Sequence, residues 1–133
     1  MPEKQHNKTF PFTPNYDDLT EILTDHNLAA LGDAYVNFVY SLALSNRKGK
    51  PAGAKTKGTT LAQALRKASL REHLPSRMSS HTLADAAEAL LAYAWLHNHI
   101  TFKESVATLN KNKDVIEGFT QLLTTAKKRI KLS

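Results

Sequence analysis

Residues 31–38 read LGDAYVNF and residues 83–91 read LADAAEALL, so acidic side chains interrupt two otherwise apolar stretches. Around both stretches apolar residues recur every three or four positions, a spacing that predicts helices over residues 27–46 and 80–98. The second helix carries alanine and leucine around most of its circumference, which is typical of a helix buried on nearly all sides. The two helices therefore predict an all-α fold with a packed centre.

The remainder of the chain predicts shorter helices and no strand. Residues 1–16 are proline-containing, and we expect a loosely packed N-terminal extension that contacts the rest through Phe10 and Phe12. Residues 17–133 are expected to form a single domain of about six or seven helices. The expected start signals of the shorter helices are Asp17 with Asp18, Thr59 or Thr60, the pairs Ser69/Glu72 and Thr101/Glu104, and Asn112 or Asp114.

The composition favours a protein in solution that binds polyanions. Lysine and arginine total 18 against 12 acidic residues, a formal charge of +6, and there is no cysteine. Positive charge attracts phosphate groups, and the lack of cysteine excludes disulfides and thiolate zinc sites. No apolar run approaches the roughly 20 residues that span a bilayer, and the N-terminus lacks the apolar region of a secretory signal. We therefore expect a cytoplasmic protein without a membrane partner.

A basic segment joins the two helical halves. Residues 47–58 include three of the five glycines, which predicts a solvated loop. The sequence leaves two interpretations open, a loop that grips RNA phosphates and a merely solvated one. The candidate phosphate contacts are Arg47, Lys48, Lys50, Lys55 and Lys57. A second basic cluster at residues 127–131 has the same two interpretations, since cations also suit the C-terminal end of a helix.

The carboxylates Asp33, Asp85 and Glu88 are the candidate catalytic residues. Residues three apart on a helix are neighbours, so Asp85 and Glu88 point to one place. An unpaired carboxylate in an apolar environment is costly, so either a cation or a basic side chain must offset these charges. Oxygen donors favour Mg²⁺ or Mn²⁺ over zinc. On the residues alone, a divalent-cation site and a set of ion pairs both remain open.

The two acidic stretches resemble the two motifs of the ribonuclease III family, L-G-D-A-x-x-N-F and L-A-D-x-x-E-A-L-I. The resemblance covers roughly residues 28–109 and looks like the short archaeal-type members, which lack a separate double-stranded-RNA-binding domain. It implies an all-helical endonuclease domain that works as a homodimer on double-stranded RNA. It also implies that Asp33, Asp85 and Glu88 hold the Mg²⁺ or Mn²⁺ ion that assists phosphodiester hydrolysis in RNA processing.

The resemblance has departures at three positions. The family signature reads E-x-x-E-F-L-G-D, but this chain has His26, Ala29 and Ala30 where the two glutamates and the aromatic residue stand. Ala29 thus removes a carboxylate that normally binds metal one turn before Asp33, and three of four expected ligands remain. Asn37, one turn beyond Asp33, is a further candidate oxygen ligand.

Three functions are compatible with these features. The first is a metal-dependent double-stranded-RNA endoribonuclease, favoured by the three retained acids. The second is a non-catalytic RNA-binding or ribonucleoprotein module that keeps the ribonuclease III fold, favoured by Ala29. The third is a helical interaction protein without an RNA role, which predicts that the acids pair with lysine or arginine and leaves the two motifs unexplained.

Overall fold

The computed structural model describes residues 10–130 and contains, within that range, helices and no strand. The expectation of an all-α fold with six or seven helices is confirmed. The elements are α1 (Leu19–Leu23), α2 (His26–Lys48), α3 (Gly58–Lys67), the 3₁₀ turn η2 (Arg71–His73), α4 (Ser80–Leu96), α5 (Phe102–Asn110) and α6 (Val115–Arg129).

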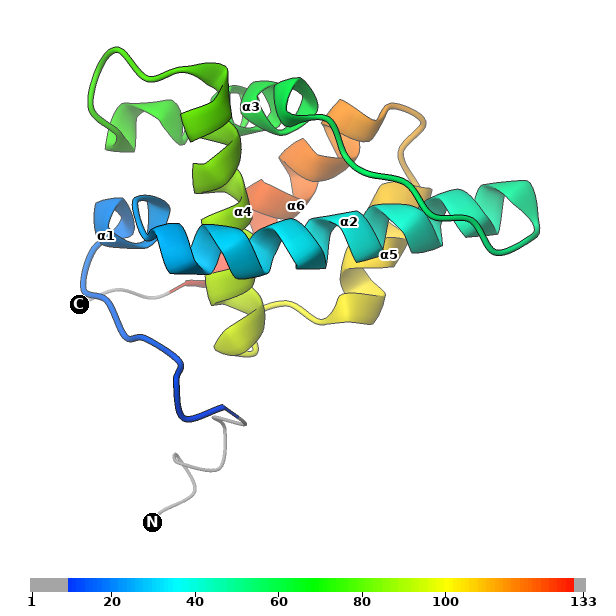
Figure 1. The fold of residues 1–133 in the computed structure, drawn as a ribbon, viewed down its shortest axis with the longest axis horizontal. Helices are drawn as coiled ribbons and strands as arrows, with labels where there is room; N and C mark the ends of the chain where they lie inside the picture. Colours follow the sequence, from blue (N-terminus) through cyan, green and yellow to red (C-terminus); the bar gives the residue numbers. More distant parts are fainter. Residues whose placement is uncertain (1–9, 131–133) are drawn as a thin grey trace.

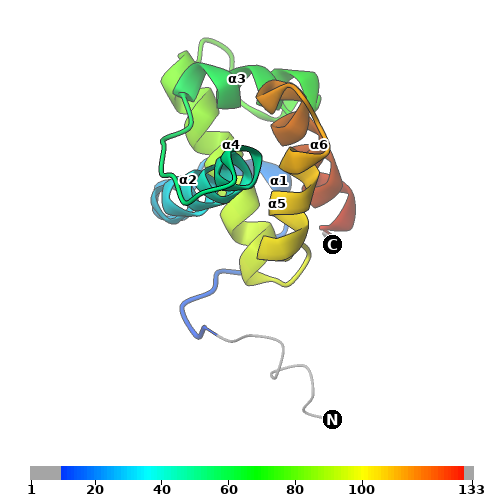
Figure 2. The ribbon, with the colours of Figure 1, turned by 90° about the vertical axis from the view of Figure 1, so that its right-hand side faces the viewer.

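Helix α4 is the centre of the fold. It packs against α1, α2, α3 and α6, and α2 lies across it at a steep angle (Figure 1). Viewed from the side, α3, α5 and α6 surround the crossing of the two long helices (Figure 2). Because neighbours approach α4 from several directions, most of its residues from Leu83 to Leu96 are buried, as its composition predicted.

At Gly32 the two long helices touch backbone to backbone. A Cβ atom placed on Gly32 of α2 would lie 2.0 Å from the carbonyl oxygen of Glu88 on α4, far inside van der Waals contact. Only glycine therefore permits this crossing, since it has no side chain. The contact sets residues 33 and 88 beside each other, and so it determines the geometry of the candidate site.

The core surrounds this crossing with large aliphatic side chains and one buried phenylalanine. Its largest fully buried members include Phe119, Leu122 and Leu123 of α6, Leu61 and Leu65 of α3, and Leu83, Leu90 and Leu91 of α4. Ion pairs at the surface connect the outer helices: Lys67 of α3 pairs with Glu117 of α6, and Arg129 lies 2.8 Å from Glu104 of α5. Exposed pairs of this kind contribute little to stability, so apolar burial holds the helices together.

The predicted helix starts have mixed outcomes. Thr101 caps α5 through Glu104 N–H, and Asp114 caps α6, as the sequence predicted. The prediction for α3 is wrong, because the helix begins at Gly58 after Lys57 and includes both Thr59 and Thr60. The Ser69/Glu72 box is also wrong, since Ser69 has a positive φ of 62° and the short turn that follows has no side-chain cap.

Residues 10–16 run over the ends of α2 and α4. Phe10 stacks on Phe12 at 5.2 Å between ring centroids and also contacts Trp95 of α4 at 5.9 Å. The backbone N–H of Tyr16 donates to the hydroxyl of Tyr93, which anchors the segment to α4. Residues 1–9 of the expected extension, and Lys131 of the second basic cluster, lie outside the described residues.

One helix of the described range, α2, is long and apolar enough to cross a membrane by length and composition. The same test is passed by core helices of globular domains, and α2 is the helix that packs on both α4 and α5.

Candidate active site

Glu88 forms the floor of the candidate site. It lies on α4 at the crossing with α2 and is only 7% exposed. Asp85, one turn earlier on α4, is half-buried, with 31% of its side chain exposed. Asp33 follows Gly32 on α2 and is exposed. The crossing therefore brings the three predicted acids from two helices to one place, with one buried carboxyl below two accessible ones.

The carboxyl groups interact strongly with one another. The pKa of Glu88 is raised to about 8, first because burial disfavours its charged form, and then because it hydrogen-bonds to Asp33 and faces the negative charges of Asp33 and Asp85. At neutral pH the Glu88 carboxyl is accordingly protonated and donates to the Asp33 carboxylate. The positive charge of Lys55 acts in the opposite direction and lowers the pKa of Glu88.

Basic side chains do not neutralise the whole cluster. The Nε2 atom of His81, one turn before Asp85, lies 3.6 Å from the Asp85 carboxylate at the surface. Within the described range, no arginine is ion-paired with any of the three acids, and Lys55 is the one lysine whose charge acts on Glu88. The third function considered above, with all acids locked onto lysine or arginine, is therefore not supported by this geometry.

The donor chemistry of the cluster fits a hard divalent cation. Carboxylate oxygens are the preferred ligands of Mg²⁺, and a buried carboxyl that shares a proton with a second carboxylate is a place where a cation can replace that proton. As the side chains stand, the described residues contain no group of three or more His, Asp or Glu already arranged to hold a metal ion. Binding would thus require deprotonation of Glu88 and rearrangement of the two accessible carboxylates.

Asn37 has a different role from a dedicated metal ligand in this arrangement. Its Oδ1 atom accepts a hydrogen bond of 2.7 Å from the backbone N–H of Thr56, and its Nδ2 atom donates weakly to Asp33 at 3.4 Å. The side chain therefore links the acidic cluster to the basic segment. One lone pair of its oxygen is already used, and the expectation that it binds metal remains a proposal.

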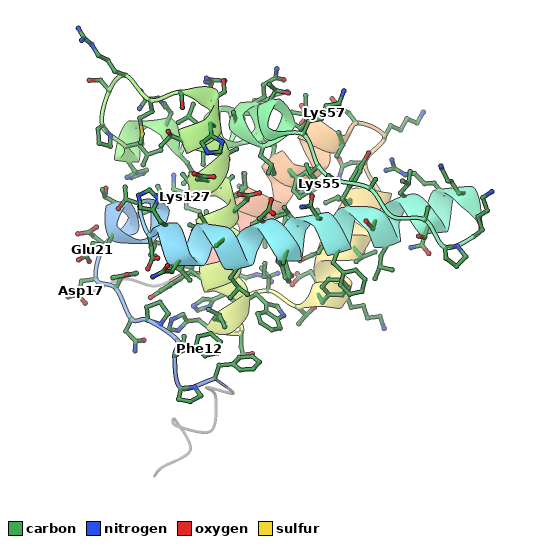
Figure 3. The ribbon with its side chains drawn as sticks, viewed as in Figure 1. Phe12, Asp17, Glu21, Lys55, Lys57 and Lys127 are labelled. Atoms are coloured by element: carbon green, nitrogen blue, oxygen red, sulfur yellow. The ribbon has the colours of Figure 1, made fainter. Side chains whose placement is uncertain are left out.

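The five basic candidates of residues 47–57 separate into two groups. Arg47 donates to the carbonyl oxygens of Leu109 and Asn112, at 2.8 and 2.6 Å, and so satisfies the end of α5. The lysines Lys48, Lys50, Lys55 and Lys57 are exposed, and Figure 3 labels Lys55 and Lys57 on the stretch between α2 and α3. Arg47 is exposed as well, but its guanidinium is engaged by the two carbonyl oxygens near the end of α5.

The comparison with known families gives one match. A sequence profile described as Ribonuclease III matches residues 26–131, which is most of the chain. The chain belongs to the ribonuclease III family. No curated protein sequence matches this ribonuclease III domain. The acidic residues of the two motifs that suggested the family, Asp33, Asp85 and Glu88, are the ones that meet at the helix crossing.

Two of the three positions at which this ribonuclease III domain departs from its family signature lie beside Asp85. Ala29 and His26 line a hollow of about 100 Å³ together with the carboxylates Asp25 and Asp85. Asp25 lies one residue before His26, the position of the first glutamate in the family signature. It caps α2 by accepting from Leu28 N–H at 2.9 Å. Burial opposes its ionisation, but hydrogen bonds from Tyr16 and Leu28 hold the pKa of Asp25 below its ordinary value.

Sequence reasoning missed the side chains that support the site. His81 next to Asp85 was not singled out, although it stands one helical turn away. Ser41 and Ser45 of α2 hydrogen-bond to the backbone of the basic segment, and their spacing of four from Asn37 was a signal available in the sequence. The backbone groups that these side chains contact belong to a loop without sequence periodicity, so only the folded chain reveals the contacts.

Proposed function

We propose that this protein is a double-stranded-RNA endoribonuclease that uses a divalent cation, Mg²⁺ or Mn²⁺, to hydrolyse phosphodiester bonds in RNA processing. The observation that carries the proposal is the meeting of Asp33 and Asp85 at the buried carboxyl of Glu88. Three acids at one helix crossing are costly when all are ionised, and a bound cation would offset their charges. Family membership supplies the reaction class.

The residues have distinct roles in this proposal. Glu88 would hold the cation as its ionised carboxylate, with a side chain that burial keeps in place. Asp33 and Asp85 supply the accessible carboxylates, one from each helix, and Asn37 is a further candidate ligand. When bound, the cation supplies Lewis-acid stabilisation of the charge that develops on the phosphate oxygens. Lys48, Lys50, Lys55 and Lys57 bind flanking phosphates, whereas Arg47 mainly holds α5.

We further propose a homodimer, acting in the cytoplasm. Among residues 10–130, three large apolar side chains are exposed, with Phe12 at 63%, Leu31 at 40% and Phe38 at 59%. They line two adjoining hollows of about 380 and 340 Å³, and Leu31 belongs to both. A contiguous apolar surface of this kind is typical of a protein interface, and a twofold pairing of α2 with α2 would cover it.

A second candidate function, a non-catalytic RNA-binding module, is favoured by Ala29. Position 29 carries no carboxylate, and Asp25, which lines the same hollow, is already used to cap α2. Such a module would bind duplex RNA and leave it intact with either metal.

The experiment that separates the two candidates uses the purified full chain with an RNA duplex, with Mg²⁺, with Mn²⁺ and with EDTA. We expect cleavage only with metal, and loss of cleavage in Glu88→Gln. Glu72→Gln is the matched control, since this exposed glutamate lies on η2 and not on the two helices that carry the cluster, and it should cleave normally. Binding without cleavage by the native protein supports the non-catalytic module, and unchanged cleavage by Glu88→Gln refutes the assignment of the site.

A further inference from the structure

The basic segment between α2 and α3 is tied to α2 by two serine hydroxyls. Ser45 Oγ accepts from the backbone N–H of Ala52 at 2.9 Å and lies 3.0 Å from the carbonyl oxygen of the same residue. Ser41 Oγ makes the same pair of contacts with Ala54, both at 3.0 Å. Each hydroxyl thus contacts the N–H and the carbonyl of one residue, much as a neighbouring β-strand does.

Asn37 completes a ladder of three side chains. Its Oδ1 atom accepts from Thr56 N–H at 2.7 Å, so positions 37, 41 and 45 of α2 pair with positions 56, 54 and 52. Four residues of helix rise about 6.0 Å, and two residues of extended chain span about 6.6 Å. The two repeats match closely, which explains how an extended segment stays in register along one face of a helix.

The ladder turns the lysines outward. Residues 52, 54 and 56 are half-buried against α2, whereas residues 51, 53, 55 and 57 are exposed. Because alternate residues of an extended chain point to opposite sides, Lys55 and Lys57 project together from the outer side. Figure 1 shows the segment running back over α2 from its C-terminal end toward α3.

The inner end of the segment reaches the acidic cluster. The charge of Lys55 acts on Glu88, and Asn37, which holds Thr56, also contacts Asp33. The fixed stretch of backbone therefore ends beside the carboxylates, with its two lysines in a defined position relative to them (Figure 3).

We propose that Asn37, Ser41 and Ser45 are positioning residues that hold residues 49–57 as a fixed basic edge, from which Lys55 and Lys57 bind neighbouring backbone phosphates of one RNA strand beside the carboxylates. That the bound strand is RNA rests on the proposed function, whereas the ladder rests on the hydrogen bonds themselves. A segment that is already ordered loses little conformational entropy when RNA binds.

The test compares Ser41→Ala/Ser45→Ala with the native protein. The control is Ser76→Ala/Ser80→Ala, which removes two exposed serine hydroxyls away from the segment. Amide hydrogen exchange reports the ladder directly, and trypsin reports access to Lys55 and Lys57. RNA affinity is measured on an RNA duplex in EDTA over a range of salt concentrations, so that no cleavage intervenes. Lys55→Gln and Lys55→Arg are measured in the same way.

We expect the double serine variant to fold, to lose exchange protection at Ala52 and Ala54, and to be cut by trypsin in the segment. Its RNA affinity should fall by roughly 5- to 30-fold, which corresponds to the entropy of ordering about one further residue on binding. The slope of log K against log salt should stay unchanged, because the variant keeps every charge. Lys55→Gln should reduce the slope of log K against log salt by about 0.9, by analogy with duplex DNA, and Lys55→Arg should restore it.

Native affinity in the double serine variant, or an unchanged slope in Lys55→Gln, overturns the proposal. Because Lys55 is exposed, its variant tests the phosphate contact even if the serine variant unfolds. A native protein that binds duplex RNA but does not cleave it contradicts the proposed catalysis and leaves the basic edge standing. A native protein that binds no duplex RNA contradicts both.

Discussion

Two residues, Gly32 and Glu88, determine the candidate site. Gly32 lets the backbone of α4 approach α2, and that approach both buries Glu88 and places Asp33 next to it. Burial then raises the pKa of Glu88, so the same contact that shapes the site also sets its proton chemistry. A sequence reader sees the glycine and the acids, but the crossing that relates them exists only in the folded chain.

Gly32→Ala should destabilise the fold strongly. The added Cβ would lie 2.0 Å from the Glu88 carbonyl oxygen, which belongs to backbone that cannot rotate away. We expect a loss of about 3 kcal/mol or more in the free energy of unfolding, measured by urea denaturation, because the two helices must separate. Gly53→Ala is the control, since its Cβ would meet nothing within 4 Å, and its stability should be unchanged or raised by up to about 1 kcal/mol.

The raised pKa of Glu88 predicts a pH-dependent stability. Its folded pKa is about 8, against an ordinary value of 4.5 in the unfolded chain, so between these values the folded state binds more protons. Stability contributed by this residue therefore falls as pH rises through that window. In EDTA, Glu88→Gln should gain stability relative to the native protein as pH rises from about 5 to about 8, since its neutral amide does not ionise.

Urea denaturation at several pH values measures this difference. Glu72→Gln, an exposed glutamate, should show no such trend. A margin for Glu88→Gln that shrinks toward high pH would mean that the carboxylate is stabilised in the folded protein, contrary to its burial.

At the scale of elements, periodicity located the long helices, and capping signals located the starts of α5 and α6 but not that of α3. Helix α2 (His26–Lys48) extends only slightly past the expected 27–46, because its apolar spacing continues over many turns. Helix α3 begins earlier than threonine capping suggested, directly after Lys57, with no side-chain cap. The helix starts just after Thr56, whose N–H donates to Asn37 of α2 at the end of the ladder. A tertiary contact rather than a local capping signal therefore positions its start.

The two kinds of helix start predict different effects of losing a threonine. Thr101→Ala removes the hydroxyl that accepts from Glu104 N–H at 3.0 Å and should cost about 1 kcal/mol of unfolding free energy. Thr59→Ala should cost nothing measurable, because Thr59 lies inside α3 and alanine has the higher helix propensity. Thermal denaturation of both variants checks this, and an equal loss in the two would mean that Thr59 caps the helix in solution.

At the scale of the molecule, α2 separates two surfaces of different chemistry. Leu31 and Phe38 lie about 160° and 140° around the helix from Asp33, as successive residues turn by about 100°. The acidic cluster and the basic edge thus face one side, and the apolar hollows face another. The sequence predicted the acidic and basic residues but not the exposed apolar surface, because several residues that line it come from α4 and α5.

This separation allows a homodimer to form without covering the carboxylates, and one exposed side chain tests it. Phe38 is 59% exposed and packs on Phe102 at 4.9 Å, so Phe38→Glu leaves the core intact while placing a charge in the apolar hollow. In a twofold pairing through α2 that charge faces its own copy and is desolvated, which should shift the protein to monomer. Sedimentation equilibrium over a range of concentrations measures the change. Gln63→Glu, which adds the same charge on the exposed side of α3, should remain dimeric. A native protein that is monomeric throughout, or a Phe38→Glu variant with native self-association, would exclude this surface as the interface.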